Sequence, residues 1–197
     1  MQVSDARYAR AQEVELEWWQ NNHYDPYVEW RFYDKVFLPY YPDRLDSLVS
    51  VDVGSGPVPF LNNHNVSYNA GIAVDPLIFE YEKILKYDLY NTRHFRRHTD
   101  IRTLVEDCAS VVFCLNTLDH CQDPAALIAE MSRILVRDGK IFIYLDIDKP
   151  PDPAHPLQIT RDWLAHELLA EFEPELWLEK KSFKFQNRVL YFVGRKR

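Results

Sequence analysis

Glycine and cysteine are scarce in this chain, with 5 glycines and 3 cysteines among 197 residues. The cysteines, Cys108, Cys114 and Cys121, are odd in number and have no Cys-x-x-Cys spacing, so we expect neither a disulfide framework nor a cysteine zinc site. No run approaches the roughly 18 apolar residues of a membrane span, and the first residues lack the apolar core of a signal peptide. We therefore expect a cytoplasmic protein without a membrane partner.

Positive charge is also in short supply. The chain has 23 Lys and Arg residues against 30 Asp and Glu residues, a formal net charge of −7. Because phosphate backbones reward clustered cations, this balance argues against a nucleic-acid partner, with a basic cluster at residues 93–98 as a local exception. A hydrophobic share of 47% and a charged share of 27% are typical of a globular protein. The length suits one domain with a sizeable core, and no pattern indicates an oligomeric state.

Residues 1–47 are predicted to form an N-terminal helical segment that belongs to the same domain. Helices are expected at residues 6–19, 26–37 and 44–48. Pro26 is placed to open the second helix and Asp43 to cap the third. Aromatic side chains are concentrated in this segment, so we expect it to cover a pocket as a lid and to pack on the sheet, with Trp18 and Trp30 in packing.

Residues 48–197 are predicted to form an α/β domain, because short apolar runs alternate with helical patterns. Strands are expected at 48–53, 71–74, 95–99, 110–115 and 140–145, helices at 77–87, 124–136 and 161–171, and a closing hairpin of strands at 176–185 and 188–193. This order predicts a three-layer α/β/α sandwich around a mainly parallel seven-stranded sheet that ends in an antiparallel hairpin. Ligands of such sheets bind beyond the carboxyl ends of the strands.

The first predicted strand of this domain ends in Asp52-Val53-Gly54-Ser55-Gly56. Glycines after a buried strand allow a sharp turn and a close approach of a ligand, although a plain turn explains the loop equally well. Pro59 stands where the dinucleotide fingerprint needs its third glycine, so that fingerprint is excluded. Asp75 ends the next strand, 21 residues after Gly54, a position from which a carboxylate accepts hydrogen bonds from both ribose hydroxyls. Together these residues favour a nucleoside site.

At this point the sequence resembles the class I S-adenosylmethionine-dependent methyltransferases, over about residues 48–146. Asp52-x-Gly54-x-Gly56 is similar to the first family motif, and Ala73-Val74-Asp75-Pro76 to the second. Residues 98–101 fall where the family places an Asp and an apolar residue against adenine. Residues 111–124 and 133–140 are similar to the fourth motif and to the helix-turn-strand stretch after it.

The resemblance implies the Rossmann-like methyltransferase fold, S-adenosylmethionine as cofactor, and methyl transfer to an oxygen or nitrogen atom of a small-molecule acceptor. The residues that it places against the cofactor are Asp52, Gly54, Ser55, Gly56, Asp75, Pro76, Asp100, Ile101, Leu115 and Asn116. The sequence departs from the family at Val58, in place of a third glycine, and at Ser110, in place of an Asp. These departures leave a non-catalytic binding module on the same fold as an alternative, and the basic cluster at residues 93–98 keeps methylation of RNA or protein as another.

Catalytic and substrate-binding candidates come from the loops and from the N-terminal segment. His120, with Asp119 beside it, follows the strand at 110–115, and a histidine side chain is a common general base. Tyr24, Tyr27 and His155 are candidates for lining the acceptor pocket. We expect no metal, because Asp119, His120 and Cys121 are adjacent in a turn and adjacent side chains rarely converge on one ion.

Overall fold

The computed structural model describes residues 1–22, 25–42, 48–84, 93–181 and 188–197. Its strands are β1 (Val49–Val53), β2 (Ala70–Val74), β3 (Arg96–His98), β4 (Ala109–Leu115), β5 (Leu135–Ile147), β6 (Phe172–Lys181) and β7 (Arg188–Lys196). Within the described ranges they form one seven-stranded sheet in the order β3-β2-β1-β4-β5-β7-β6. The first five strands pair in parallel, and β7 pairs antiparallel with both β5 and β6. The predicted sheet and its closing hairpin are confirmed.

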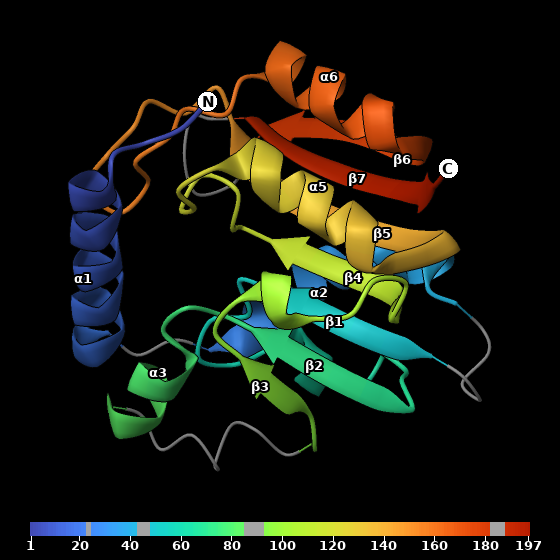
Figure 1. Cartoon of the computed structure of the whole chain (residues 1–197), viewed down its shortest axis with the longest axis horizontal. Helices are drawn as coiled ribbons and strands as arrows, with labels where there is room; N and C mark the ends of the chain where they lie inside the picture. The colour runs from blue at the N-terminus through green and yellow to red at the C-terminus, as the bar shows by residue number, and fades with distance from the viewer. Residues whose placement is uncertain (23–24, 43–47, 85–92, 182–187) are drawn as a thin grey trace.

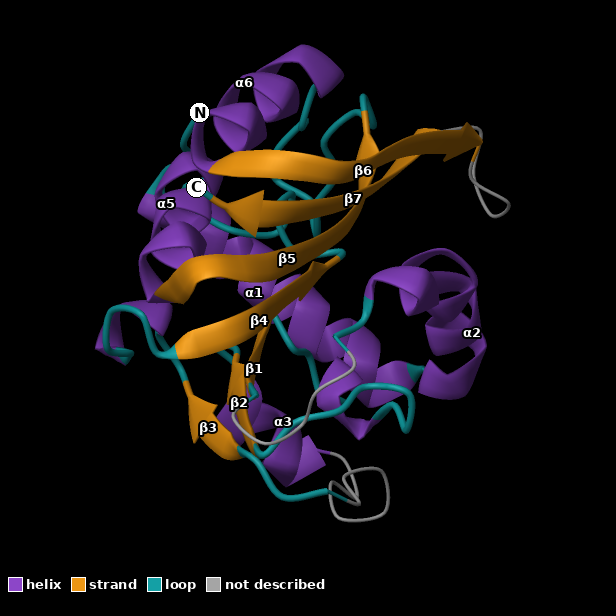
Figure 2. Ribbon diagram, turned by 90° about the vertical axis from the view of Figure 1, so that its right-hand side faces the viewer, coloured by secondary structure: helices purple, strands orange, loops and turns teal. Residues whose placement is uncertain are grey.

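Helices cover both faces of this sheet, as Figure 2 shows. They are α1 (Asp5–Asn21), α2 (Pro26–Phe37), α3 (Ile78–Ile84), α5 (Pro124–Ile134) and α6 (Arg161–Glu171), with short 3-10 helices at Leu38–Tyr40, Phe60–Asn62 and Ile101–Thr103. Helices α5 and α6 lie on one face and α2 on the other. The predicted three-layer α/β/α sandwich is therefore confirmed.

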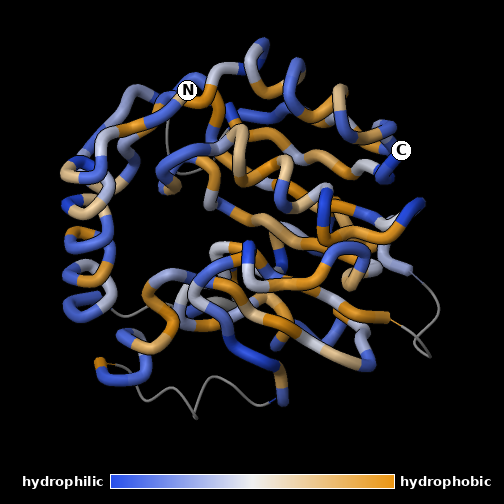
Figure 3. The backbone as a smooth tube through the Cα atoms, in the orientation of Figure 1, coloured by the Kyte–Doolittle hydropathy of each residue, from blue (hydrophilic) through white to orange (hydrophobic). Residues whose placement is uncertain are grey.

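Alternate side chains of each central strand enter two separate cores. In β4, Val112 and Cys114 pack with Met131 of α5, whereas Val111 and Phe113 pack on the opposite face among the aromatic residues of α2. Because both faces are covered, the strand is apolar at every position from Val111 to Leu115, as is typical of a buried parallel strand. Figure 3 shows the resulting hydrophobic colour along the centre of the sheet. The strands that carry the site are thus packed between two apolar cores.

Helix starts follow their capping residues closely. Asp123 accepts a hydrogen bond from the backbone N–H of Ala126, and Thr160 accepts one from Trp163. These caps satisfy donors that the first helical turn leaves unpaired. The helix predicted at 161–171 is confirmed residue for residue, and the one predicted at 26–37 likewise.

The largest difference from the predicted elements lies between α5 and β5. We predicted a helix to residue 136, a turn at 137–139 and a strand from 140, but α5 ends at Ile134 and β5 begins at Leu135. Leu135 pairs with Ala109, and the register then shifts, so the residues of the predicted turn form an irregularity within the strand. Within this irregular stretch, Asp138 has a φ of +63°. Gly139, which we took as the end of the helix, therefore belongs to a bulge in the strand.

Other boundaries moved where long strands continue the predicted ones. Strand β6 begins at Phe172, directly after α6, and not at residue 176, and β7 continues to Lys196. Four predicted stretches lie outside the described residues: 44–47 of the helix predicted at 44–48, 85–87 of the helix predicted at 77–87, 182–185 of the strand predicted at 176–185, and the turn predicted at 186–187.

Helix α1 stands across the end of the sheet at which β1, β2 and β4 finish (Figure 1). The backbone N–H of Val3 donates to the carbonyl oxygen of Gln122 (3.1 Å), and the Trp19 ring lies edge-on to Tyr81 of α3, with ring centroids 6.3 Å apart. The helix is thus anchored near both of its ends above the site. No helix in the described ranges is long and apolar enough to cross a membrane.

Candidate cofactor and substrate site

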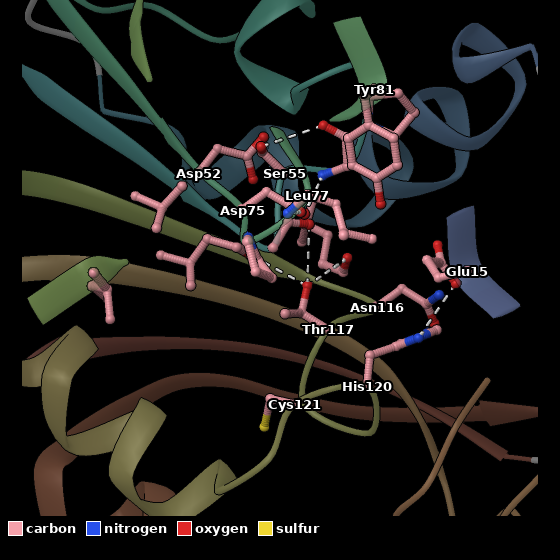
Figure 4. Close-up of a pocket in the computed structure, with 18 of the residues that line it drawn as sticks. Glu15, Asp52, Ser55, Asp75, Leu77, Tyr81, Asn116, Thr117, His120 and Cys121 are labelled. Carbon is pink, nitrogen blue, oxygen red and sulfur yellow. Dashed lines mark hydrogen bonds and ion pairs between the residues drawn. The ribbon is translucent and has the colours of Figure 1, made fainter. Parts of the chain in front are cut away.

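A cavity of about 480 Å³ opens at the carboxyl ends of β1, β2 and β4, below α1 and α2. Its volume lies in the range of small-molecule binding sites. All ten residues that the sequence predicted against a cofactor line it, namely Asp52, Gly54, Ser55, Gly56, Asp75, Pro76, Asp100, Ile101, Leu115 and Asn116. Figure 4 shows part of this lining, with Asp75 and Ser55 near Thr117. The motifs therefore meet in space as their order predicted.

Two glycines shape the loop after β1. Gly54 has a φ of +67° and Gly56 a φ of +58°, a region of backbone space that favours glycine. At Gly54 there is also no room for a side chain, because Thr117 of the neighbouring strand loop fills the place of a Cβ atom. The Thr117 hydroxyl lies 3.2 Å from the carbonyl oxygen of Val53, to which it donates. Gly54 thus allows the loops after β1 and β4 to close on one another at the cavity floor.

Asp75 organises the same loop from the end of β2. One carboxylate oxygen accepts from the Gly56 N–H (2.9 Å), and the other accepts from the Leu77 N–H (2.8 Å), which caps the turn into α3. The residue is 7% exposed and lines the cavity. Since an ionised carboxylate has about four acceptor sites, two remain after these contacts. Asp75 therefore has the capacity to accept from a ligand diol while it holds the loop.

Asp52 lies buried on β1, where one of its carboxylate oxygens accepts from the Phe60 N–H at 2.6 Å. Burial raises the pKa of Asp52 to about 7, opposed by the hydrogen bond from Phe60 and increased by the charge of Asp75. Burial likewise raises the pKa of Asp75 to about 6, opposed by the hydrogen bonds from Leu77 and Gly56 and increased by the charge of Glu15. Two buried carboxyls with raised pKa values in one cavity wall are typical of a functional site.

These raised pKa values predict that alkaline pH destabilises the fold. A carboxyl whose pKa is higher in the folded state stabilises the protein fully below its unfolded pKa, and this contribution is lost as the pH rises through about 7 for Asp52. Relative to an Asp52→Asn variant, which keeps a carbonyl acceptor for Phe60, we expect the wild type to lose about 2 kcal/mol of unfolding free energy between about pH 5 and pH 8. Urea denaturation over this range measures the difference, and parallel curves for the two proteins would refute it.

The far end of the cavity is formed by the segment after β3. Ile101 is 6% exposed and presents an apolar surface. Asp100 accepts from the backbone N–H of Arg102 and forms a two-point ion pair with its guanidinium group. An apolar side chain beside a fixed carboxylate suits the face and the edge of a planar base.

The roof of the cavity consists of residues that the sequence analysis did not assign to it. They are Tyr8, Gln12, Glu15 and Trp19 of α1, Glu29, Trp30 and Tyr33 of α2, and Tyr81 of α3. The α1 members recur every three or four residues, which places them on one helix face. This spacing is the feature of the sequence from which the cavity-facing side of α1 could have been predicted. We predicted Trp18 in packing, but its ring is 45% exposed and stacks edge-on against Trp19, which faces the cavity instead.

The predicted catalytic and substrate residues have different positions. His120 lines the cavity, with its Nδ1 atom 3.6 Å from a carboxylate oxygen of Glu15 (Figure 4). Asp119 is 2% exposed and outside the cavity lining, as is His155, whose ring centroid lies 4.2 Å from that of His120. Tyr24 lies outside the described residues, and Tyr27 lies in α2 with a side chain that is not described.

We expected no metal because Asp119, His120 and Cys121 are adjacent in a turn. Cys121 instead directs its thiol to the carbonyl oxygen of Leu118. Its place is taken by His155, and one ligand atom each from Asp119, His120 and His155 lies within 4.8 Å of the others. Side chains from two separate loops therefore converge where the sequence showed only neighbours in a turn.

Comparisons with known proteins agree with this architecture. A family model described as a methyltransferase domain matches residues 51–143. The N-methyltransferase NodS from Bradyrhizobium japonicum, solved with S-adenosylhomocysteine, has a similar structure at 12% identity, with a TM-score of 0.69 over 98% of this chain and 99% of NodS. A comparison with curated protein sequences gives no significant match.

Two further solved structures have the same fold. The 1,6-didemethyltoxoflavin-N1-methyltransferase of Burkholderia thailandensis, with its substrate and S-adenosylhomocysteine bound, is 16% identical with a TM-score of 0.66 over 98% of this chain and 91% of that one. A putative methyltransferase of Bacillus halodurans is 15% identical with a TM-score of 0.66 over 86% of this chain and 99% of that one. The chain has the fold of these solved methyltransferases, and its residues 51–143 match the methyltransferase domain model.

Proposed function

We propose that this protein is an S-adenosylmethionine-dependent methyltransferase that acts on an oxygen or nitrogen atom of a small-molecule acceptor. One observation carries the proposal: the ten residues of the family motifs line a single cavity that helices α1 and α2 cover. NodS and the toxoflavin enzyme are solved with S-adenosylhomocysteine, the product that this cofactor leaves.

The cavity offers complementary chemistry for each part of the cofactor. Asp75 would accept from the ribose hydroxyls, and Asp100 and Ile101 would contact adenine. The loop at Gly54 and Gly56 would contact the methionine portion, because it presents backbone without side chains. The negative charge of the buried carboxyls favours a sulfonium cation, since opposite charges attract more strongly away from water.

The acceptor would occupy the end below α1 and α2. Glu15 and Glu29 stand there among the rings of Trp19, Trp30 and Tyr33, so the surface is aromatic and acidic. Such a surface suits a small acceptor with an aromatic ring or an amine, because carboxylates and ring faces both attract cations. We propose that the N-terminal helical segment, residues 1–47, serves as a lid over this end and belongs to one domain with residues 48–197.

Nucleic acid is a poor alternative, because the basic cluster is partly engaged inside the protein. The Arg93 guanidinium donates to the carbonyl oxygens of Leu61, Asn63 and Val66 and lies over the Tyr68 ring at 3.9 Å. A side chain that holds three carbonyl groups of its own chain is not available to phosphates. This arrangement supports the small-molecule proposal over RNA methylation.

Methyl transfer from a sulfonium needs alignment of the acceptor and exclusion of water more than covalent help. The aromatic roof would supply both. Where the acceptor is a hydroxyl or a protonated amine, a base assists, and His120 is the candidate in the cavity wall, with Asp119 behind it.

The proposal predicts binding of both cofactor forms and a mass gain in one metabolite. Calorimetry with S-adenosylmethionine and S-adenosylhomocysteine should give one site per chain with micromolar affinity or better. Incubation with cofactor and a small-molecule extract of the source cells should add one methyl group, seen by untargeted mass spectrometry, to a compound that stays unchanged with heat-denatured protein.

Each outcome separates the alternatives. Absence of binding at high micromolar ligand would refute the methyltransferase proposal. Binding without methylation of any metabolite, RNA or protein fraction would favour the non-catalytic module. Methylation confined to RNA or protein would replace the small-molecule acceptor.

A further inference from the structure

We propose that Asp119, His120 and His155 bind one divalent transition-metal ion, of the Zn²⁺ or Co²⁺ type, behind the cavity wall. One ligand atom of each side chain lies within 4.8 Å of the other two. Two bonds of about 2.0–2.1 Å at a tetrahedral angle separate ligand atoms by about 3.3 Å, so movements of about an ångström close the site. The proposal does not depend on methyl transfer.

Two atoms of this cluster are buried and have no hydrogen-bond partner. They are Oδ1 of Asp119 and Nε2 of His120. Asp119 is 2% exposed, so its unpaired oxygen is far from water. Leaving a buried carboxylate oxygen unpaired costs several kcal/mol in an apolar surrounding. A cation bound between these atoms would satisfy both at once.

The other nitrogen of each histidine is oriented by a carboxylate. Nδ1 of His120 lies 3.6 Å from Glu15, and Nδ1 of His155 lies 2.8 Å from Asp152. Metal-ligating histidines almost always have such a carboxylate or carbonyl partner on the second nitrogen, which fixes the tautomer and leaves the first nitrogen to bind the ion. Nδ1 of each ring thus faces a carboxylate, by a hydrogen bond in His155 and by an ion-pair contact in His120, whose Nε2 is buried without a hydrogen-bond partner.

Hydrogen bonds within the loop that carries His155 fix its backbone. Asp152 accepts from the backbone N–H groups of Ala154 (3.0 Å) and His155 (2.8 Å), and the Asp152 N–H donates to the His155 carbonyl oxygen (2.9 Å). The Leu157 N–H donates to the carbonyl oxygen of Asp119 at 3.4 Å and so ties the two ligand loops together. A site whose ligands are positioned before binding loses less entropy on binding.

The local charge also favours a cation. Three carboxylates, Asp119, Glu15 and Asp152, surround the two imidazoles, against one ammonium group, that of Lys149. Lys149 lies 3.1 Å from Asp152 and 3.0 Å from Nδ1 of His155. Two imidazole nitrogens and one carboxylate oxygen suit Zn²⁺, Co²⁺, Ni²⁺ or Fe²⁺ rather than Mg²⁺ or Ca²⁺, which prefer oxygen.

Such an ion would hold the cavity wall in place. His120 belongs to the loop after β4 and His155 to the loop after β5, so the ion would cross-link two loops at the acceptor end. With Nε2 bound to metal and Nδ1 beside Glu15, the imidazole has no free nitrogen to take a proton. His120 would then be a positioning residue, and metal binding decides between this role and that of a base.

The experiment is a metal titration of the full chain without an affinity tag, after chelator treatment. Competition with a chromophoric chelator should show one Zn²⁺ per chain, and Co²⁺ should give the visible absorption of a nitrogen- and oxygen-bound ion. His155→Ala should weaken Zn²⁺ binding at least about 100-fold, and Asp152→Asn about 10- to 100-fold, as for other partners of metal-bound histidines. Added Zn²⁺ should raise the thermal midpoint of the wild type and leave that of His155→Ala unchanged.

His166→Ala is the matched control, because His166 is exposed on α6, away from the cluster. It should bind Zn²⁺ like the wild type. His120→Gln provides a second ligand variant in case His155→Ala fails to fold, with circular dichroism as the check. Absence of stoichiometric Zn²⁺ binding, equal affinity in a folded ligand variant, or a thiolate absorption band with Co²⁺ would each overturn the proposal.

Discussion

Replacing Asp75 by Ala should weaken the binding of S-adenosylhomocysteine at least about 100-fold. A hydrogen bond to a charged group contributes about 1.5–3 kcal/mol, and the ribose diol would donate two of them to this carboxylate. Two such bonds lost amount to 3 kcal/mol or more, and each 1.4 kcal/mol is a factor of ten in affinity. Calorimetry at about pH 8, where the carboxyl with its pKa of about 6 is ionised, measures the effect.

Asp75 also holds the loop, so the variant needs controls for structure. Asp75→Asn keeps an acceptor for one of the N–H groups of Gly56 and Leu77 and removes the charge. Asp162→Ala removes an exposed aspartate of α6 and should bind as the wild type does.

A ligand without ribose hydroxyls completes the test of Asp75. The dideoxy analogue of S-adenosylhomocysteine should bind weakly to the wild type but lose little further affinity in Asp75→Asn, since the partners of the missing bonds are already gone. If the hydroxyls contribute equally in both proteins, Asp75 does not contact the ribose. Unchanged affinity in a folded Asp75 variant would have the same meaning.

The sheet could be predicted from the sequence because the apolar pattern of each strand agrees with the way the strand is packed in the fold. The run at Val111 to Leu115 is apolar at every position, and such a strand fits only between two covered faces. The same reasoning failed at residues 137–139, where a glycine after basic residues signals a helix end. The pairing of Leu135 with Ala109 prevailed, because tertiary strand pairing outweighs a local turn preference.

The site likewise has one part that the sequence predicts and one part that it does not. Its floor follows each strand directly, so Gly54, Asp75 and Asn116 were predictable from their positions at strand ends. The roof depends on which helix face meets the sheet, and that contact joins residues far apart in sequence. Glu15 and His120 are an example, since only the docking of α1 brings them to 3.6 Å. The pairing of His120 with His155 likewise results from the folding of a proline-rich loop that has no periodic pattern.

Gly54→Ala should destabilise the fold by about 2–5 kcal/mol, whereas Gly56→Ala should cost only about 1–2 kcal/mol. Both positions have positive φ, so a Cβ atom adds about 1–2 kcal/mol of backbone strain at each. At Gly56 a Cβ atom has open space, but at Gly54 it overlaps the Thr117 side chain. Overpacking of this kind adds about 1–3 kcal/mol. Urea denaturation of the two variants measures the difference.

A Thr117→Gly background isolates the overlap from the backbone strain at Gly54. Removing the Thr117 side chain forfeits its hydrogen bond to the Val53 carbonyl oxygen, but it clears the space that the new Cβ atom needs. The cost of Gly54→Ala should therefore fall to that of Gly56→Ala in this background. The corresponding coupling energy of about 1–3 kcal/mol measures how closely the loops after β1 and β4 approach. Equal costs of Gly54→Ala in both backgrounds would show that the two loops do not close on one another at the cavity floor.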